Sequence, residues 1–283
     1  MENSGSIKIR NSPGIVAVKE MFRRTSNTMP LVSIVTPVYN AAQFLPETLA
    51  SVRAQTMTDW EQILVDDGST DNSVAIAEAA SRGDSRFRLL RTPQNGGPTV
   101  ARNMGLAVAR GRYIAFLDAD DIWMPEKLTR CVKWMTANGY AFIYHDYRHM
   151  SQDGLRVGRV VHGPDTLTVA TQHTHRGTGC LAVVLDSERI PEINFTAVSP
   201  YHAEDFCLWT KLIRQGHEGH RFPVDLARYR LSPSGRSANK VECAINVWHL
   251  YREHSMLPFT RAVFWWIQFA WNSFWLHHHA RPH

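Results

Sequence analysis

The sequence has few cysteines, and their spacing indicates no metal site. Its 283 residues contain four, Cys131, Cys180, Cys207 and Cys243, which lie far apart and form no CxxC pair. A zinc finger needs closely spaced ligands, so none is expected. We predict that the four cysteines are reduced packing residues of a cytoplasmic protein.

The sequence also lacks a dense run of basic charge. No five consecutive residues are all Lys or Arg, and the aromatic signature of an RNA-binding sheet does not occur. The net charge of +5 and the pI near 9.1 come from basic residues that are spread along the chain. This balance suits an anionic ligand or an acidic membrane surface, and we expect no nucleic-acid partner.

Neither of the two common phosphate-binding loops is present. No GxGxxG follows the first predicted strand, which argues against a nicotinamide dinucleotide site, and no GxxxxGK[ST] occurs. The glycine-rich segment that does occur, Asn95-Gly96-Gly97, leads into a predicted helix with Arg102. Its glycines allow close backbone approach, and Arg102 is expected either to meet a phosphate or to pair with an Asp at the sheet edge.

A continuous apolar run that could form a signal peptide or a membrane span is missing as well. Residues 1–29 are polar and mixed, and we expect a flexible extension there. Residues 259–276 are rich in Trp and Phe but are interrupted by Gln268, Asn272 and Ser273, whereas a span needs about 20 mostly apolar residues. Two interpretations stay open: an interfacial helix on a membrane, or a helix packed on the domain or in a homodimer.

The sequence does contain a regular alternation of β-rich and helical segments. Amphipathic helical segments separate predicted strands at residues 32–38, 62–65, 86–90, 112–117 and 141–147. This alternation is typical of βαβ units, which build a doubly wound, mostly parallel central sheet flanked by helices. We therefore predict an α/β protein with a single such sheet and a C-terminal helical extension.

Polar and aromatic residues follow three of the predicted strands. Tyr39 and Asn40 come after the first, Asp66 and Asp67 after the second, and residues 118–121 after the fourth. Ligands of open parallel sheets bind beyond the carboxyl ends of the strands, so these residues should meet at one edge. A ring can stack on a base, an Asp can accept from a base N–H, and an Asp cluster can hold a metal against a diphosphate. Packing explains Tyr39 alone, and helix capping explains Asn40 or Asp66 alone, but together they predict a nucleotide diphosphate pocket.

Three carboxylates lie within four residues at the end of the fourth predicted strand. Like charges held close together raise the free energy, so a cation or water has to compensate them. Asp118 and Asp120 are two residues apart on an extended chain and share a face, and Mg²⁺ or Mn²⁺ takes carboxylate oxygens. A solvated turn is the competing interpretation, and Asp121 could also cap the helix that begins near Pro125.

These segments, in their order along the chain, resemble family 2 glycosyltransferases of the GT-A fold, of the bacterial surface-polysaccharide type. The motifs of the first half are Pro37-Val38-Tyr39-Asn40, Asp66-Asp67-Gly68-Ser69-Thr70-Asp71, Asn95-Gly96-Gly97 with Ala101-Arg102-Asn103-Met104-Gly105, and Asp118-Ala119-Asp120-Asp121. The motifs of the second half are the acidic pair before a Trp, Ala203-Glu204-Asp205-Phe206-Cys207-Leu208-Trp209, and a loop near the nucleotide, Arg228-Tyr229-Arg230-Leu231-Ser232 with Ser234 and Ser237. The resemblance covers about residues 31–240.

The resemblance implies an inverting transfer of a sugar from a nucleotide-diphosphate sugar, here expected to be a UDP-sugar, with Mn²⁺ or Mg²⁺ as cofactor. The acceptor hydroxyl must lose a proton as it attacks, and Asp205, with Glu204 beside it, is the candidate catalytic base. Both fall in the first turn of a predicted helix, whose partial positive charge would hold Asp205 ionised. Simple stabilisation of the helix dipole is their alternative role.

The same resemblance assigns the donor-binding residues. It places Asp120 on the metal, Asp118 on the donor ribose or sugar, and Tyr39 and Asp67 against the base. The other residues expected at the nucleotide-sugar site are Pro37, Asn40, Ala119 and the phosphate candidates Arg102, Arg230 and Ser237.

One position departs from the family pattern. Many relatives carry a His that assists the metal or phosphate where this chain has Ser232. Either carboxylate, diphosphate and water complete the metal shell, or another residue such as His202 takes that role.

The resemblance also divides the chain. Residues 1–29 would be the extension, residues 30–240 the GT-A domain and residues 241–283 an aromatic-rich helical tail. Within the domain, residues 30–147 would bind the nucleotide sugar and residues 148–240 the acceptor, because loops on a rigid scaffold set specificity.

The expected function is synthesis of a glycan, polysaccharide or lipid-linked oligosaccharide in the cytoplasm or at the inner face of the cytoplasmic membrane. A nucleotidyltransferase that makes NDP-sugars is one alternative, but it usually begins with a glycine-rich Lys or Arg loop that this chain does not supply. A non-catalytic carbohydrate-binding relative is the other, and it would have little use for both Asp120 and Asp205.

Overall fold

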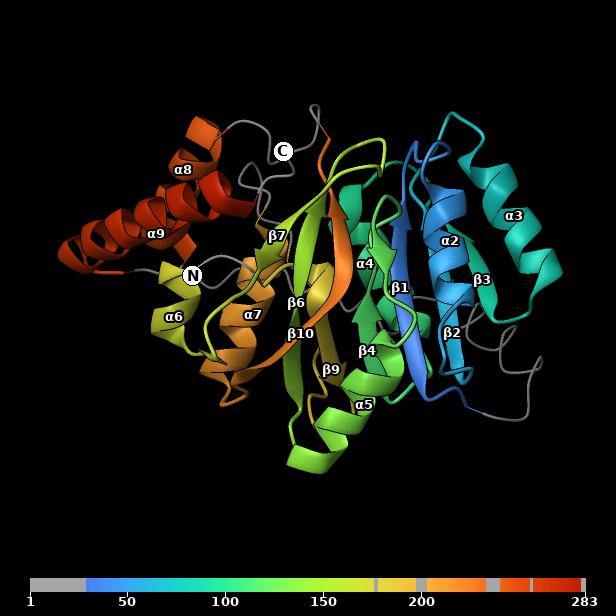
Figure 1. The fold of residues 1–283 in the computed structure, drawn as a ribbon, viewed down its shortest axis with the longest axis horizontal. Helices are drawn as coiled ribbons and strands as arrows, with labels where there is room; N and C mark the ends of the chain where they lie inside the picture. Colours follow the sequence, from blue (N-terminus) through green and yellow to red (C-terminus); the bar gives the residue numbers. More distant parts are fainter. Residues whose placement is uncertain (1–28, 176–177, 197–202, 233–239, 255–256, 281–283) are drawn as a thin grey trace, which may run out of the picture.

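A computed structural model describes residues 29–175, 178–196, 203–232, 240–254 and 257–280. The predicted N-terminal extension lies outside the described residues apart from Met29. The described chain folds around one sheet with helices on both faces, and the C-terminal helices lie at the end of the molecule opposite α3 (Figure 1).

The sheet runs in the order β3-β2-β1-β4-β9-β6-β10-β5, with β7 paired to β6 and β8 paired to β10. Its strands are β1 (Val32–Val38), β2 (Trp60–Asp66), β3 (Phe87–Arg91), β4 (Tyr113–Phe116), β5 (Ile122–Trp123), β6 (Phe142–Met150), β7 (Val157–Val161), β8 (Thr166–Leu167), β9 (Val183–Asp186) and β10 (Gly219–Arg230).

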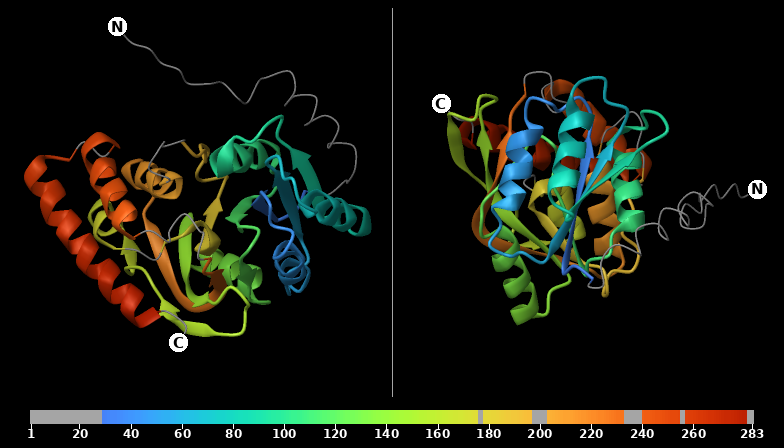
Figure 2. Two further views of the ribbon diagram at one scale, coloured as in Figure 1. Left: turned by 90° about the horizontal axis from the view of Figure 1, so that it is seen from above. Right: turned by 90° about the vertical axis from the view of Figure 1, so that its right-hand side faces the viewer.

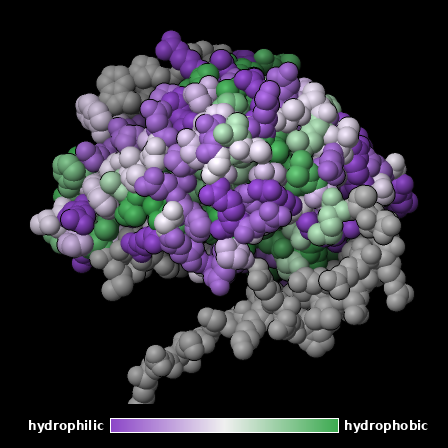
Figure 3. Space-filling view, turned by 90° about the horizontal axis from the view of Figure 1, so that it is seen from below, coloured by the Kyte–Doolittle hydropathy of each residue, from purple (hydrophilic) through white to green (hydrophobic). Residues whose placement is uncertain are grey.

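Helices connect and cover these strands. They are α2 (Leu45–Arg53), α3 (Ser73–Gly83), α4 (Gly97–Val108), α5 (Lys127–Asn138), α6 (Val169–Thr174), α7 (Glu204–Arg214), α8 (Lys240–His249) and α9 (Phe259–Ala280), with a 3₁₀ turn η2 (Cys180–Ala182) and a π-helical turn η3 (Leu250–His254). Viewed from below, the molecular surface is mostly hydrophilic, with smaller hydrophobic patches between the polar regions (Figure 3).

The first half of the sheet is parallel, as the alternating pattern predicts. β1 pairs in parallel with β2 and β4, and β2 pairs in parallel with β3. All seven residues of β2 are buried, and so are all but one of β1. Strands covered by helices on both faces bury their whole length, which explains why these segments are apolar runs rather than alternating ones.

The second half is mixed, which corrects the expectation of a mostly parallel sheet. β9 runs antiparallel to both β4 and β6, and β5, β7 and β8 are antiparallel to their partners. Only β10 and β6 pair in parallel there among the described strands. Two antiparallel neighbours need no crossover helix, so no βαβ signal marked this part of the sequence.

The twelve-residue strand β10 was not predicted, and residues 228–230, expected in a loop, form its end. Its pairing with β6 shifts register between Phe222 and Asp225 and again between Asp225 and Arg228. The first shift places two extra residues on β10 and the second places one, and such insertions disturb the regular alternation on which strand prediction depends.

A buried ion-pair cluster joins β1, β2 and β3 near the amino end of the sheet. The Glu61 carboxylate is 2.6 Å from the Arg88 guanidinium and 2.9 Å from that of Arg110, and it accepts from the Ser33 hydroxyl at 2.7 Å. Burial by itself raises the pKa of Glu61, but the charge of Arg88 and the hydrogen bonds outweigh it and hold this pKa below its ordinary value of 4.5.

We expect Glu61→Gln to lower the free energy of unfolding by about 3 kcal/mol at pH 7, because it leaves Arg88 buried without its countercharge. A carboxylate whose pKa is lower in the folded state stabilises the fold above its unfolded pKa. Its contribution is lost as the pH falls below 4.5 through the lower folded value. Urea unfolding at pH 7 and pH 3 should therefore show a smaller pH dependence for Glu61→Gln than for the wild type. Glu78→Gln, which alters an exposed pair with Arg82, is the control; an equal effect of both substitutions would contradict the prediction.

The C-terminal helices pack beside α6 and α7 and form one outer side of the molecule (Figure 2). Tyr251, Leu257 and Ala262 make a small core of their own, and Phe206 of α7 and Trp265 pack against it. None of the helices within the described ranges combines the length and apolar character that crossing a bilayer requires. The aromatic segment thus forms a helix with one side packed on the domain.

Candidate active site

The loops that follow β1 and β2 are tied together at the carboxyl edge of the sheet. The Asn40 side-chain oxygen accepts from the Thr70 N–H at 2.8 Å, and the Asn40 N–H donates to the Ser69 hydroxyl at 3.0 Å. The expected capping role of Asn40 is wrong, because α2 begins at Leu45 with Phe44 at its N-cap. Asn40 instead has a left-handed backbone, with φ of 46°, and joins the two loops.

Two other residues expected at the nucleotide lie at this edge. Tyr39 directly follows β1, and 53% of it is exposed. Pro37 lies within β1 opposite Val65 of β2. The exposed ring is therefore open to a ligand, whereas Pro37 shapes the strand end beneath it.

Asp67 holds the glycine-rich loop. Its carboxylate accepts from the Thr92 hydroxyl at 2.8 Å and from the N–H groups of Gly96 and Gly97 at 3.0 and 2.7 Å. Gly97 has a φ of +78°, a conformation that costs glycine little and lets successive N–H groups converge on one carboxylate. Asp67 is 3% exposed, so its observed role is to fix the glycine-rich loop at the sheet edge, and its contact with the base stays a prediction.

Arg102 links the Asp cluster to the acidic pair of the second half. Its guanidinium is 2.7 Å from Asp118 and 3.3 Å from Glu204, and 3% of the residue is exposed. Burial lowers the pKa of Arg102, but the two carboxylates raise it by more, so the side chain is a fixed cation. Of the two roles expected for Arg102, the pairing with an Asp at the sheet edge is the one confirmed.

A close helix–strand contact positions Arg102. Gly105 lies one turn further along α4, and a Cβ built on it would be 2.6 Å from Val35 of β1. Only a glycine lets α4 approach β1 so closely, and this approach sets Arg102 at the end of β4. The motif glycine thus acts through packing.

Glu204 and Asp205 begin α7, as the helical periodicity predicted. The helix forms because Leu208, Leu212 and Ile213 recur at helical spacing, and all three are buried. Glu204 is buried, and the partly buried Asp205 accepts from the Phe206 N–H at 2.7 Å. The first turn, where the backbone N–H groups lack helical partners, stabilises both negative charges.

The Asp cluster forms a turn that hydrogen bonds from α2 hold in place. The Thr48 hydroxyl donates to the carbonyls of Ala119 and Asp121, each at 2.9 Å. Asp118 and Asp120 are partly exposed, whereas Ala119 and Asp121 are buried. The turn thus directs two carboxylates outward and anchors the residues between and after them.

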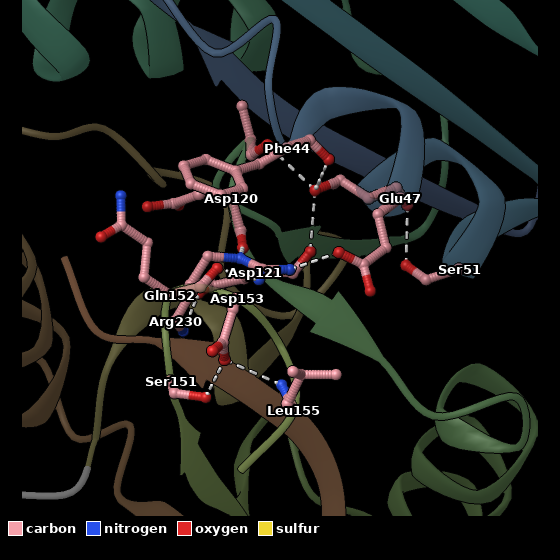
Figure 4. Close-up of polar contacts among 12 residues, drawn as sticks. Phe44, Glu47, Ser51, Asp120, Asp121, Ser151, Gln152, Asp153, Leu155 and Arg230 are labelled. Carbon is pink, nitrogen blue, oxygen red and sulfur yellow. Dashed lines mark hydrogen bonds and ion pairs between the residues drawn. The ribbon is translucent and has the colours of Figure 1, made fainter. Parts of the chain in front are cut away.

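Arg230 clamps the same turn from β10. Its side chain donates to the Asp120 carbonyl and to the Gln152 carbonyl, each at 2.8 Å, and pairs with Glu47 of α2. Figure 4 shows Arg230 between these elements, beside the turn that joins β6 to β7. The side chain is 2% exposed, and these three contacts hold the turn in place. Its contact with a phosphate stays a prediction.

Asp121 faces the interior. Burial raises its pKa well above the ordinary value, and the charges of Asp120 and Asp118 raise it further, whereas the hydrogen bond from the Arg230 N–H opposes them. It does not cap α5, whose N-cap is Glu126. Burial also disfavours the charged form of nearby Lys127, and it lowers the pKa of that amine. Asp121 is therefore part of the support beneath the turn.

Sequence reasoning missed several of these contacts. Thr48, Glu47 and Gln152 carry no motif and act through backbone carbonyls or an ion pair, so no spacing identifies them. Cys180 lies near Arg102 and the acidic residues, and burial raises the pKa of its thiol well above the ordinary value. Ser237 and His202 lie outside the described residues, and Ser232 lies two residues beyond the end of β10.

The oxygen ligands at this site suit a metal that is shared with a substrate. The described residues contain no group of three side chains that could hold a metal by themselves. Mg²⁺ and Mn²⁺ commonly use one or two carboxylates together with substrate phosphates and water. Asp118 and Asp120, both partly exposed on one turn, fit that second arrangement.

The fold is that of the GT-A glycosyltransferases, and comparison with known proteins agrees. The profile of glycosyl transferase family 2 matches residues 33–184. TuaG of Bacillus subtilis, named for teichuronic acid biosynthesis, is 36% identical over 88% of this chain and 98% of its own length. The Escherichia coli glucosyltransferase WfgD, which is named for transfer from UDP-Glc to α-D-GlcNAc-diphosphoundecaprenol, is 34% identical over 83% of this chain and 90% of its own.

Solved structures support the fold. TarS of S. aureus in complex with UDP has a TM-score of 0.61 at 20% identity, covering 84% of this chain and 70% of that one. The mannosyltransferase PcManGT of Pyrobaculum calidifontis, in complex with GDP-Man and Mn²⁺, also has a TM-score of 0.61, at 17% identity, covering 87% of this chain and 73% of that one. The chain belongs to glycosyl transferase family 2 and is a glycosyltransferase.

Proposed function

We propose that this glycosyltransferase moves a sugar, with inversion, from a UDP-sugar to a hydroxyl of a lipid-linked or polysaccharide acceptor at the cytoplasmic face of a membrane. The observation that carries the proposal is the ion-pair bridge from Asp118 through Arg102 to Glu204. It unites a turn suited to a metal-diphosphate with a helix start suited to a base. The names of TuaG and WfgD favour the acceptor class.

In the proposed mechanism Asp205 is the base. The acceptor hydroxyl gives its proton to the Asp205 carboxylate as its oxygen bonds to the anomeric carbon. The bond from that carbon to the diphosphate oxygen breaks on the opposite face, and nucleoside diphosphate leaves. Glu204 and Arg102 hold the start of α7 in position for this displacement.

Asp120 and Asp118 would hold Mn²⁺ or Mg²⁺ together with the diphosphate. When bound, the metal stabilises the negative charge that builds on the leaving group. Asp118, fixed by Arg102, would also contact the donor ribose or sugar, with Tyr39 and Asp67 beside the base. Ala119 and Asn40 would shape the pocket through their backbone and loop contacts.

The domain boundaries follow from the same roles. We assign residues 30–147 to the donor and residues 148–240 to the acceptor, because the donor candidates Tyr39, Asp67 and Asp118 precede residue 148 and Asp205 follows it. We assign residues 241–283 to the C-terminal tail, whose described part contains most of α8 and all of η3 and α9. The two halves share one sheet, which holds both substrates in a fixed relation.

Release of UDP from UDP-glucose and UDP-GlcNAc in the presence of Mn²⁺ and membrane acceptors tests the function. We expect EDTA to abolish release and Asp120→Asn to lower it by a factor of about 100 or more, since the leaving group loses its charge stabilisation. Asp153→Asn, in the neighbouring turn of Figure 4, is the matched control and should keep wild-type activity. Full activity in EDTA would contradict the metal requirement, and no release with any donor would contradict the function.

A further inference from the structure

α9 has an apolar face on its outer side as well as on its packed side. Towards the domain, Ala262 and Phe269 are buried, and the Trp266 N–H donates to the Ala244 carbonyl at 2.9 Å. On the other side Phe264, Ile267 and Trp271 are 59%, 58% and 64% exposed. Their spacing of three and four residues places all three on one stripe of the helix. This stripe is called the outer face below.

An exposed stripe of large apolar side chains at this density is unusual for a soluble surface. Moving each such side chain out of water lowers the free energy, so a row of three favours contact with another apolar phase. α9 is already fixed to the domain by its packed side. The three side chains of the outer face stay more than half exposed while α9 packs on the domain through its other side.

The charges around the outer face indicate which partner fits. Glu253 is the last acidic residue of the sequence, so nothing beyond it carries a negative side chain. Arg252 of η3 and Arg261 in the first turn of α9 are exposed, and the Arg261 guanidinium is 5.8 Å from the centre of the Trp265 ring. A second copy of the chain would bring like charges together, whereas an anionic lipid surface supplies the opposite charge.

We propose that the outer face of α9, formed by Phe264, Ile267 and Trp271, docks onto an anionic bilayer with the helix lying in the interface. Trp and Phe beside Arg are the side chains that enter the boundary between headgroups and acyl chains. The described helices are not suited to span a membrane, and an in-plane helix does not need to.

The docked helix would lie close to the candidate base. The His173 ring is 4.9 Å from the Trp265 ring of α9 and 5.0 Å from the Phe206 ring of α7, measured between centroids. Phe206 is the residue after Asp205. Through these packed rings, docking of α9 sets the height of the active site above the lipid. That this height brings a lipid-linked acceptor to Asp205 rests on the proposed function. The docking itself does not.

Co-sedimentation of the full chain with vesicles tests the docking directly and requires no substrate. We expect binding to vesicles of phosphatidylglycerol and phosphatidylcholine, and weaker binding to phosphatidylcholine alone or in 0.5 M salt. The triple variant Phe264→Ser/Ile267→Ser/Trp271→Ser should lower the partition coefficient by roughly a hundredfold. Leu155→Ser/Val157→Ser, which removes comparably exposed apolar side chains at the β6–β7 hairpin, should bind as the wild type does.

A gain-of-binding variant covers the case in which the triple variant does not fold. Gln268 is exposed beside the outer face, and Gln268→Leu should strengthen vesicle binding severalfold. The proposal is overturned if the wild type does not bind, if the triple variant folds and binds like the wild type, or if Gln268→Leu changes nothing. It is also overturned if light scattering shows a wild-type dimer that the triple variant breaks while vesicle binding stays the same. If the wild type binds vesicles but releases UDP from no donor, the proposed function is rejected and the docking stands.

Discussion

Asp205→Asn is expected to lower kcat by a factor of about 10²–10⁴ while the KM for the UDP-sugar stays nearly unchanged. Asn keeps the size of the side chain and can accept a hydrogen bond from Phe206, but it cannot take the proton of the acceptor hydroxyl. The loss should therefore appear in the chemical step and not in donor binding. Initial rates of UDP release at saturating donor and acceptor measure it.

The control for this substitution is Glu192→Gln. Glu192 precedes α7 in the chain, and its exposed carboxylate is 3.6 Å from Lys211 of α7. Its loss therefore perturbs α7 without a change at Asp205. Its activity should match the wild type. An Asp205→Asn enzyme with wild-type kcat would reject Asp205 as the base, and a parallel loss in both variants would point to α7 stability instead.

Arg102→Met should have the largest combined effect on stability and activity. Met retains much of the apolar volume but leaves Asp118 and Glu204 without their shared cation in a buried site. Breaking such a pair costs about 3–5 kcal/mol, which should lower Tm by roughly 10 °C. UDP release should fall by more than about 100-fold, because both the metal turn and the start of α7 lose their fixed position.

Two comparisons make the Arg102 experiment specific. Arg130→Met removes an exposed arginine 3.6 Å from Glu126 and should change the free energy of unfolding by less than about 1 kcal/mol. The double variant Arg102→Met/Glu204→Gln should be less destabilised than the sum of the single variants, since one unpaired charge is gone. Strict additivity would show that the Arg102–Glu204 contact contributes nothing.

The positions of the candidate donor-binding residues could largely be predicted from the sequence. Tyr39, Asp67 and Asp118 follow strands of a parallel half whose apolar runs are unambiguous, and the edge rule brings their positions together. The strands of the second half, to which the acceptor is assigned, could not be predicted from periodicity. β9 is short, β10 is bulged, and their antiparallel pairing leaves no helix between strands to mark them.

Single residues illustrate the same limit. Asn40 is of a residue type that often caps helices, yet it joins the loops after β1 and β2. It does not cap α2, because that helix starts five residues later, at Leu45. Arg230 matched a motif as a phosphate candidate, and only the structure shows that its guanidinium also holds the Asp120 turn and the Gln152 carbonyl. Side-chain chemistry limits what a residue can do, whereas the partners it meets decide which of those roles it performs.

The sequence by itself determined the family, the parallel half of the sheet and the order of the acidic motifs, since all three depend on local spacing. The tertiary structure decided the rest: the Arg102 bridge between residues 118 and 204, the Arg230 clamp and the two faces of α9. These features join residues far apart in the chain or depend on which side of a helix is covered. Packing in three dimensions sets both, and no local pattern carries that information.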